Sequence, residues 1–139
     1  MNGMKHRHFK LILILFFCLL FLSCEPRLTA KLLEGYPPTF HLDGDDTLLN
    51  FFVCPELPED QRNEKNAIWQ ITPDSEHNKS WPVDITYGTV PQGFTQLTPR
   101  NGERPPALEA EKRYTYHYVR GHGGGGGAFI IREGKAVAQ

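Results

Sequence analysis

The sequence lacks an excess of charge of either sign. Its 139 residues include 15 Lys and Arg against 16 Asp and Glu. A protein that binds nucleic acid through phosphate contacts needs a basic surface, so this balance argues against nucleic acid as a partner. The length also excludes the large multi-domain enzyme folds and leaves room for one small domain.

Long hydrophobic runs are missing too. The longest unbroken apolar run covers residues 11–22, whereas a helix needs about 20 apolar residues to cross a bilayer. Lys5, Arg7 and Lys10 precede this run, and no acidic residue does. A basic start followed by a short apolar run is typical of an export signal peptide. The alternatives are a buried apolar hairpin and an uncleaved anchor.

The end of this run carries a lipidation motif. Phe21-Leu22-Ser23-Cys24 resembles a bacterial lipobox, with Phe21 in place of the commoner Leu. The resemblance implies that residues 1–23 are a cleaved signal peptide and that a lipid on Cys24 anchors the protein in the bacterial cell envelope. Glu25, rather than Asp, after the lipidated residue implies the outer membrane, facing the periplasm, in a Gram-negative host. The mature chain would have 116 residues and a net charge of −4.

Cysteine is scarce, and on this interpretation no disulfide can form. Cys18 lies in the signal peptide and Cys24 carries the lipid, which leaves Cys54 without a partner. We expect Cys54 to be a buried small hydrophobe rather than a reactive thiol. A domain of this size buries about two-thirds of its unfolded surface, so it can build a core without disulfides.

No stretch of the mature chain sustains a helical period. Short apolar runs alternate with turn clusters rich in Gly, Pro, Asp and Asn, as in an all-β sandwich or barrel. Alternation within two of the runs predicts strands with one buried face. Another run, Leu48–Cys54, is apolar on both faces, which predicts a central strand or one covered on its second side. The seven predicted strands are Thr39–Leu42, Leu48–Cys54, Ala67–Thr72, Val83–Val90, Phe94–Thr98, Tyr114–Val119 and Ala128–Arg132.

We therefore expect three parts in the chain. Residues 1–23 form the signal peptide, and residues 24–38 form the lipidated Cys and a tether, within which Leu28–Leu33 has room for one helical turn. Residues 39–139 form a single antiparallel β-sandwich of about seven strands.

Two positions resemble landmarks of immunoglobulin-like and fibronectin type III domains. Leu108 lies six residues before Tyr114, the spacing of a tyrosine corner. Trp69 lies on the third predicted strand, where such domains place a core tryptophan. The resemblance implies an immunoglobulin-like sandwich with these three residues in its core, and it implies no function. Tyr116 and Tyr118 extend a stripe from Tyr114 that is either core packing or an exposed aromatic face.

The most unusual segment is Gly121-His122-Gly123-Gly124-Gly125-Gly126-Gly127. It contains the dinucleotide pattern GxGxxG and the esterase pattern HGGG, but neither the βαβ unit nor the GxSxG motif that these functions need. We expect a long, mobile hairpin loop, whose glycines are either slack or a bare backbone that a partner approaches closely. This loop is the leading candidate for a binding site.

Metal ligands and catalytic pairs are not recognisable. Asp43, Asp45 and Asp46 suggest calcium, but Cys54 stands where an EF-hand has its distal Glu, so we expect a polar turn. The histidines lack the spacing of zinc ligands such as HExxH, and His117 is expected to face solvent. We predict no metal, no cofactor and no catalytic activity.

Three functions remain. The first is a membrane-anchored, non-enzymatic envelope lipoprotein that binds a protein or envelope component through its loops. The lipobox, the β-rich body and Glu111-Lys112-Arg113-Tyr114-Thr115-Tyr116-His117-Tyr118 resemble small bacterial lipoproteins, some of them described as periplasmic immunity proteins against type VI secretion toxins. That resemblance implies the second, toxin neutralisation, which a toxin gene directly upstream would indicate. The third is a structural subunit of an envelope assembly, which would co-purify with a large complex.

Overall fold

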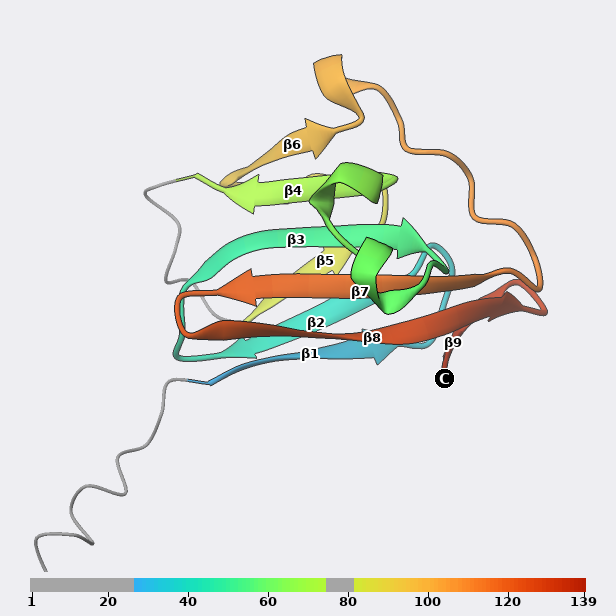
Figure 1. Ribbon diagram of the computed structural model, residues 1–139, viewed down its shortest axis with the longest axis horizontal. Coiled ribbons are helices and arrows are strands. Elements are labelled where there is room, and N and C mark those ends of the chain that lie inside the picture. The colour runs from blue at the N-terminus through green and yellow to red at the C-terminus, as the bar shows by residue number, and fades with distance from the viewer. Residues whose placement is uncertain (1–26, 75–81) are drawn as a thin grey trace, which may run out of the picture.

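Two antiparallel β-sheets pack face to face to form the domain (Figure 1). The computed structural model describes residues 27–74 and 82–139, so the predicted signal peptide and Cys24 lie outside the described residues. This part of the chain has short 3₁₀ helices η1 (Glu59–Gln61), η2 (Glu64–Asn66) and η3 (Arg100–Gly102). Its strands are β1 (Leu28–Leu33), β2 (Thr39–Gly44), β3 (Leu48–Pro55), β4 (Trp69–Pro73), β5 (Val83–Thr86), β6 (Phe94–Thr98), β7 (Arg113–Arg120), β8 (Gly123–Arg132) and β9 (Lys135–Ala138).

The two sheets are unequal in size. The smaller has the order β1-β2-β5, and the larger has the order β6-β4-β3-β7-β8-β9. Consecutive strands change sheet between β2 and β3, between β4 and β5, and between β5 and β6. The expected all-β sandwich is therefore confirmed, with nine strands among the described residues rather than about seven.

The seven predicted segments all contain strands because each alternates or concentrates apolar residues between turns. The position of β3 explains why both of its faces are apolar. It lies in the middle of the larger sheet, between β4 and β7, and Phe51 and Val53 face the core. Phe52 and Cys54 face the other way and are buried as well, since the connection containing η1 and η2 covers that side.

Aromatic rings from both sheets fill the core. Phe40 of β2 lies 4.7 Å from the Tyr116 ring and 5.0 Å from the Phe51 ring, measured between centroids. Trp69 is fully buried, packs edge-on against Tyr87, and donates a hydrogen bond from Nε1 to Gln96 Oε1 at 3.1 Å. The prediction that Trp69 belongs to the core is confirmed.

The contacts expected of Leu108 and Tyr114 are present, although β6 and β7, which this connection joins, lie in the same sheet. Leu108 and Tyr114 are buried, and the backbone N–H of Glu109 donates to the Tyr114 hydroxyl at 2.9 Å. This bond ties the start of β7 to the connection that precedes it. The tyrosine stripe belongs to the core side of β7, where Tyr116 is buried and Tyr118 is half-buried.

The predicted tether is wrong over most of its length. Leu28–Leu33 forms neither a tether nor a helical turn but strand β1, which pairs with β2 along all six residues. Leu28 is buried, and Ala30 and Leu32 are half-buried on the same face, while Thr29 and Lys31 are exposed. This alternation is the mark of a strand with one face on the core.

Candidate functional site

Polar side chains gather on the outer face of the larger sheet, which points away from the core. β3, β7 and β8 are neighbours, so their outward residues form rows across the strands. The two central rows consist of Phe52, His117 and Gly126, and of Cys54, Thr115 and Ala128. The connection containing η1 and η2 lies against this face, since Cys54 Sγ donates to the Asn63 carbonyl at 3.6 Å.

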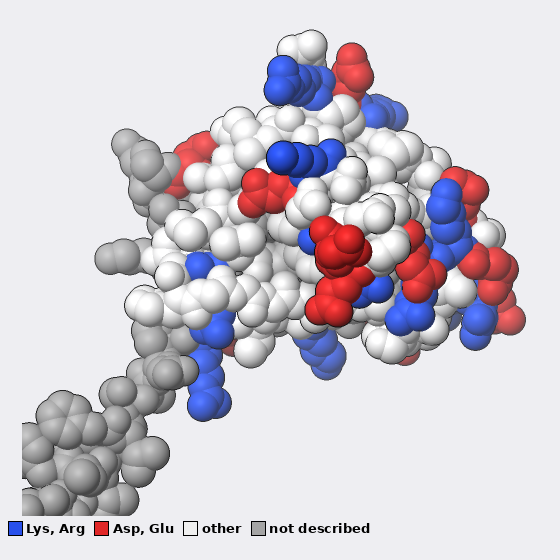
Figure 2. All heavy atoms as spheres, in the orientation of Figure 1, with Lys and Arg blue, Asp and Glu red and all other residues white. Residues whose placement is uncertain are grey.

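Two hollows flank the side chain of Arg62 on this face, and together we call them the outer groove. The larger, of about 500 Å³, is lined by Phe52, Arg62, Asn63, Glu64, Lys65 and Val119. The smaller, of about 310 Å³, is lined by Arg62, Thr115, His117, Gly126, Gly127 and Ala128. Figure 2 shows acidic and basic side chains interspersed over this side of the molecule.

Arg62 is fixed in place by its own connection. Its Nε donates to the Leu57 carbonyl at 2.6 Å, and the side chain is half-buried. The turn that follows is capped, because the Asn63 side chain accepts a hydrogen bond from the Lys65 backbone N–H at 3.1 Å. The guanidinium is thereby held between the two hollows.

Three buried polar atoms on the outer face have no hydrogen-bond partner among the described residues. They are Asn50 Oδ1, Thr115 Oγ1 and His117 Nε2. Most buried polar atoms in proteins are hydrogen-bonded, so such a group calls for an explanation. Thr115 and His117 both line the smaller hollow.

His117 does not face solvent as expected. Its ring stacks on Phe52 with centroids 5.0 Å apart and an interplanar angle of 17°. Burial lowers the pKa of His117 from its ordinary value, and the positive charge of Arg62 lowers that pKa further. The ring is therefore neutral at pH 7, with one nitrogen protonated and the other able to accept.

The glycine-rich segment is not a long loop. Gly123–Gly127 forms the first half of β8, paired with β7, and the turn itself is Gly121–His122. A Cβ on Gly126 would collide with the carbonyl oxygen of Tyr116, and a Cβ on Gly127 would lie 2.8–3.0 Å from the Tyr116 ring. The glycines are therefore needed for close packing of β8 against β7, and neither mobility nor slack explains them.

The turn at Gly121–His122 is attached to the β2–β3 turn instead. The backbone N–H of Gly121 donates to the Thr47 carbonyl at 3.0 Å. Asp46 is buried beneath the turn, with its carboxylate 3.4 Å from Arg120 Nη1 and 3.3 Å from His122 Nδ1. Burial by itself raises the pKa of Asp46, but hydrogen bonds from the Thr47 N–H and from His122 bring the pKa below its ordinary value.

The acidic segment around Asp46 forms a turn, as expected. The Arg27 backbone N–H donates a hydrogen bond to the Asp45 carboxylate, and the Asp45 backbone N–H donates to the Arg27 carbonyl. Asp45 therefore joins the start of β1 to this turn. Asp43 accepts from the Gly44 N–H at 2.8 Å. In the described part of the chain, no group of three or more His, Cys, Asp or Glu side chains is placed to hold a metal ion.

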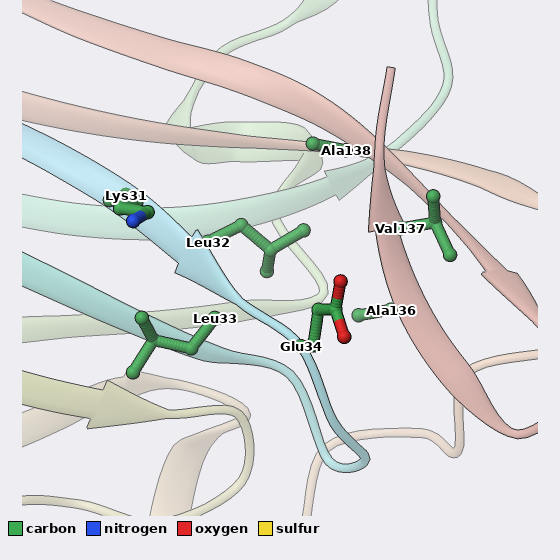
Figure 3. A pocket seen from close by; sticks show the side chains of 7 residues that line it. All are labelled: Lys31, Leu32, Leu33, Glu34, Ala136, Val137 and Ala138. Atoms are coloured by element: carbon green, nitrogen blue, oxygen red, sulfur yellow. The ribbon is translucent and has the colours of Figure 1, made fainter.

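A third hollow separates the edge strands of the two sheets. Gly35, which follows β1, forms a bridge with Ala136 of β9, and the Ala136 N–H donates to the Gly35 carbonyl at 2.9 Å. A gap of about 530 Å³ opens beside this bridge, and Figure 3 shows Leu32 and Glu34 on the side of β1 that faces β9. Lys31 and Glu34 are the charged residues that line this gap, and none of the unpartnered buried polar atoms of the described residues lies in it. The outer groove, which has two such atoms, is therefore the stronger candidate for a ligand site.

The predicted binding residues divide between two places. Gly126 and Gly127 line the outer groove, whereas Gly121 and His122 form the turn over Asp46. The intervening glycines, Gly123, Gly124 and Gly125, lie along β8. The sequence reasoning missed Arg62 entirely, since its connection carries no recognisable motif.

Cys54 is buried as expected. Burial raises the pKa of its thiol to about 11, so the thiolate form is scarce at neutral pH.

Comparisons with protein-family models, with curated proteins and with solved structures find no match for this chain. The described residues include no helix with the length and apolar character needed to cross a membrane.

Proposed function

We propose that the protein is a lipid-anchored bacterial envelope protein that acts by binding, and that its outer groove holds an anionic group of the bound partner. The basic start, the short apolar run and the lipobox support anchoring through Cys24. Glu25 supports an outer-membrane location in a Gram-negative host. The binding role is supported by the groove, at the side of the sandwich rather than in its end loops.

The unpartnered polar atoms beside Arg62 carry the proposal. Thr115 Oγ1 and His117 Nε2 are buried without a hydrogen-bond partner, and they line the same hollow as Arg62. A hydroxyl, a neutral imidazole and a guanidinium can all donate hydrogen bonds. The planar fork of Arg suits a carboxylate or phosphate group, which such donors would bind together.

Titration with acetate and with inorganic phosphate tests the groove. We expect the NMR signals of the His117 ring and of Arg62 Nε to shift on titration, with a Kd on the order of 1 mM for such small probes, equivalent to about 4 kcal/mol. Arg62→Gln should abolish the shift of the His117 ring signals, and Arg100→Gln, which changes an exposed arginine elsewhere, should leave that shift unchanged. Shifts that persist in Arg62→Gln would disprove anion binding at this site.

Metabolic labelling with a clickable palmitate tests the anchor. The wild-type protein should incorporate the label, and Cys24→Ser should not. Cys18→Ser serves as the matched control, because this cysteine lies within the predicted signal peptide and should leave labelling intact. Equal labelling of Cys24→Ser and wild type would rule out lipidation at Cys24.

A further inference from the structure

The start of β1 is fixed to the body of the domain. Arg27 directly precedes β1, and its carbonyl accepts a hydrogen bond from the Asp45 N–H at 2.8 Å. Its own N–H donates to the Asp45 carboxylate. Leu28 is buried in the core, and a Cβ on Gly44 would collide with the Arg27 carbonyl, so the contact is close. The domain therefore begins at Arg27, without a free segment after it.

This boundary leaves little chain between the domain and the predicted lipid. Only Glu25 and Pro26 separate Cys24 from Arg27. Three residue steps of extended chain span at most about 11 Å, however they are arranged. The expected tether of residues 24–38 would have allowed a much larger separation.

The end of the sandwich next to Arg27 forms a surface that we call the anchor face and define by Arg27, Asp45, Thr47, Leu49 and His122. It contains the β2–β3 and β7–β8 turns, both at the left-hand end of the domain in Figure 1. The two turns are joined by the hydrogen bond from the Gly121 N–H to Thr47, described above. Leu49 is 48% exposed beside them.

We propose that the anchor face lies against the membrane to which Cys24 is attached, so that the strands point away from the bilayer and the outer groove opens sideways. This inference depends on the lipidation in the proposed function. The length of the chain between Cys24 and Arg27 identifies the bilayer as the occupant of this face. The His122 turn would then be covered by lipid headgroups, which removes it as a site for a protein partner.

Electrostatic attraction is not what holds this face to the bilayer. Among the described residues at this end, Asp43, Asp45 and Arg27 are exposed. Two carboxylates against one guanidinium give no net attraction for anionic headgroups. The proximity should therefore depend on the covalent link and be insensitive to salt.

Fluorescence quenching in vesicles tests the orientation. The full chain is lipidated in cells, purified, and reconstituted into phosphatidylethanolamine–phosphatidylglycerol vesicles containing a nitroxide-headgroup lipid. A fluorophore is attached through His122→Cys or, as the matched control, through Arg132→Cys. Position 122 directly precedes β8 and position 132 is its last residue, so the length of the strand separates them by roughly 30 Å. Cys54 should not compete for the label, because its thiol is buried and has a pKa of about 11.

The fluorophore at position 122 should be quenched several-fold more strongly than the one at position 132. Insertion of ten Gly and Ser residues after Pro26 should reduce that difference, because such a linker adds roughly 18 Å of root-mean-square reach. Equal quenching at both positions, or stronger quenching at position 132, would overturn the proposal. Unchanged quenching at position 122 with the longer linker would overturn the argument from chain length.

Vesicle flotation distinguishes this proposal from the one on which it rests. If the wild type does not float with vesicles and carries no palmitate, the lipid anchor is absent and both proposals are wrong. If the wild type floats, Cys24→Ser does not, and the quenching pattern is nevertheless reversed, only the orientation is wrong.

Discussion

His117 couples the outer groove to pH. Its lowered pKa means that the unfolded chain takes up a proton near pH 6.5, whereas the folded protein does so only at a lower pH. The stability contributed by neutral His117 is therefore complete above about pH 6.5 and is lost as the pH falls towards the lowered pKa.

Replacing His117 should therefore flatten the acid side of the stability curve. Between about pH 7.5 and pH 5, the free energy of unfolding should fall less in His117→Gln than in the wild type. Urea denaturation at several pH values measures this. The matched control is His41→Gln, which replaces an exposed histidine on the other sheet whose Nδ1 lies 2.7 Å from Asp84 Oδ1. An unaltered slope in His117→Gln would contradict the assignment.

Trp69 and Tyr114 should differ in their contributions to stability. Trp69→Ala removes a fully buried ring and should cost about 3–5 kcal/mol. Tyr114→Phe removes only the hydroxyl that accepts from Glu109 N–H and should cost about 1–2 kcal/mol. Denaturant titration measures both values, and an unchanged melting temperature for Trp69→Ala would show that the core is assigned wrongly.

At the scale of a single strand, the glycines of β8 allow this strand to pack closely against β7. Gly126 faces the backbone carbonyl of Tyr116, which is fixed by the strand, whereas Gly125 faces the half-buried side chain of Tyr118, which can shift without moving the backbone. Gly126→Ala should therefore cost about 1–3 kcal/mol. Gly125→Ala should cost less, and in a Tyr118→Ala background its cost should vanish. Equal costs for the two alanine substitutions in the wild-type background would be inconsistent with this packing.

At the level of single elements, the sequence predicts those strands that the pattern of apolar residues marks. Two of the segments that became β2 to β8 alternate, the others are short apolar runs between turns, and Trp69 and Tyr114 are buried as expected. β1 shows the same alternation, but Pro26 and Gly35 beside it suggest a tether when the chain is viewed locally. A run of glycines is ambiguous for a different reason, since only the partner strand decides whether a missing side chain means a loop or close packing.

The outer groove is harder to predict than the strands. Arg62 and Thr115 are separated by 52 intervening residues, and the fold alone brings them to one hollow. Thr115 and His117 alternate with the tyrosines of β7, and this alternation predicts that they lie on the opposite face of the strand. What the alternation could not show is that the η1–η2 connection folds over that face and buries it.

As a whole, the molecule should unfold in one step. A single cluster of buried residues spans both sheets, with Phe40 and Ile85 from the smaller and Phe51 and Phe129 from the larger. Trp81→Phe leaves Trp69 as the one tryptophan of the chain, so its fluorescence reports the core. Urea transitions followed by this fluorescence and by far-ultraviolet circular dichroism should coincide. Separate midpoints would mean that the two sheets unfold independently.

The position of β1 has a mechanical consequence for an anchored molecule. If a partner pulled the domain away from the bilayer, the force between the domain and its lipid anchor would be transmitted through Arg27, along the axis of β1. β1 pairs with β2 from Leu28 to Leu33, and hydrogen bonds between antiparallel strands are perpendicular to the strand direction. Such a load shears these bonds together, whereas a load across the strand would unzip them one at a time. In a molecule anchored in this way, tension would therefore load β1 in its most resistant direction.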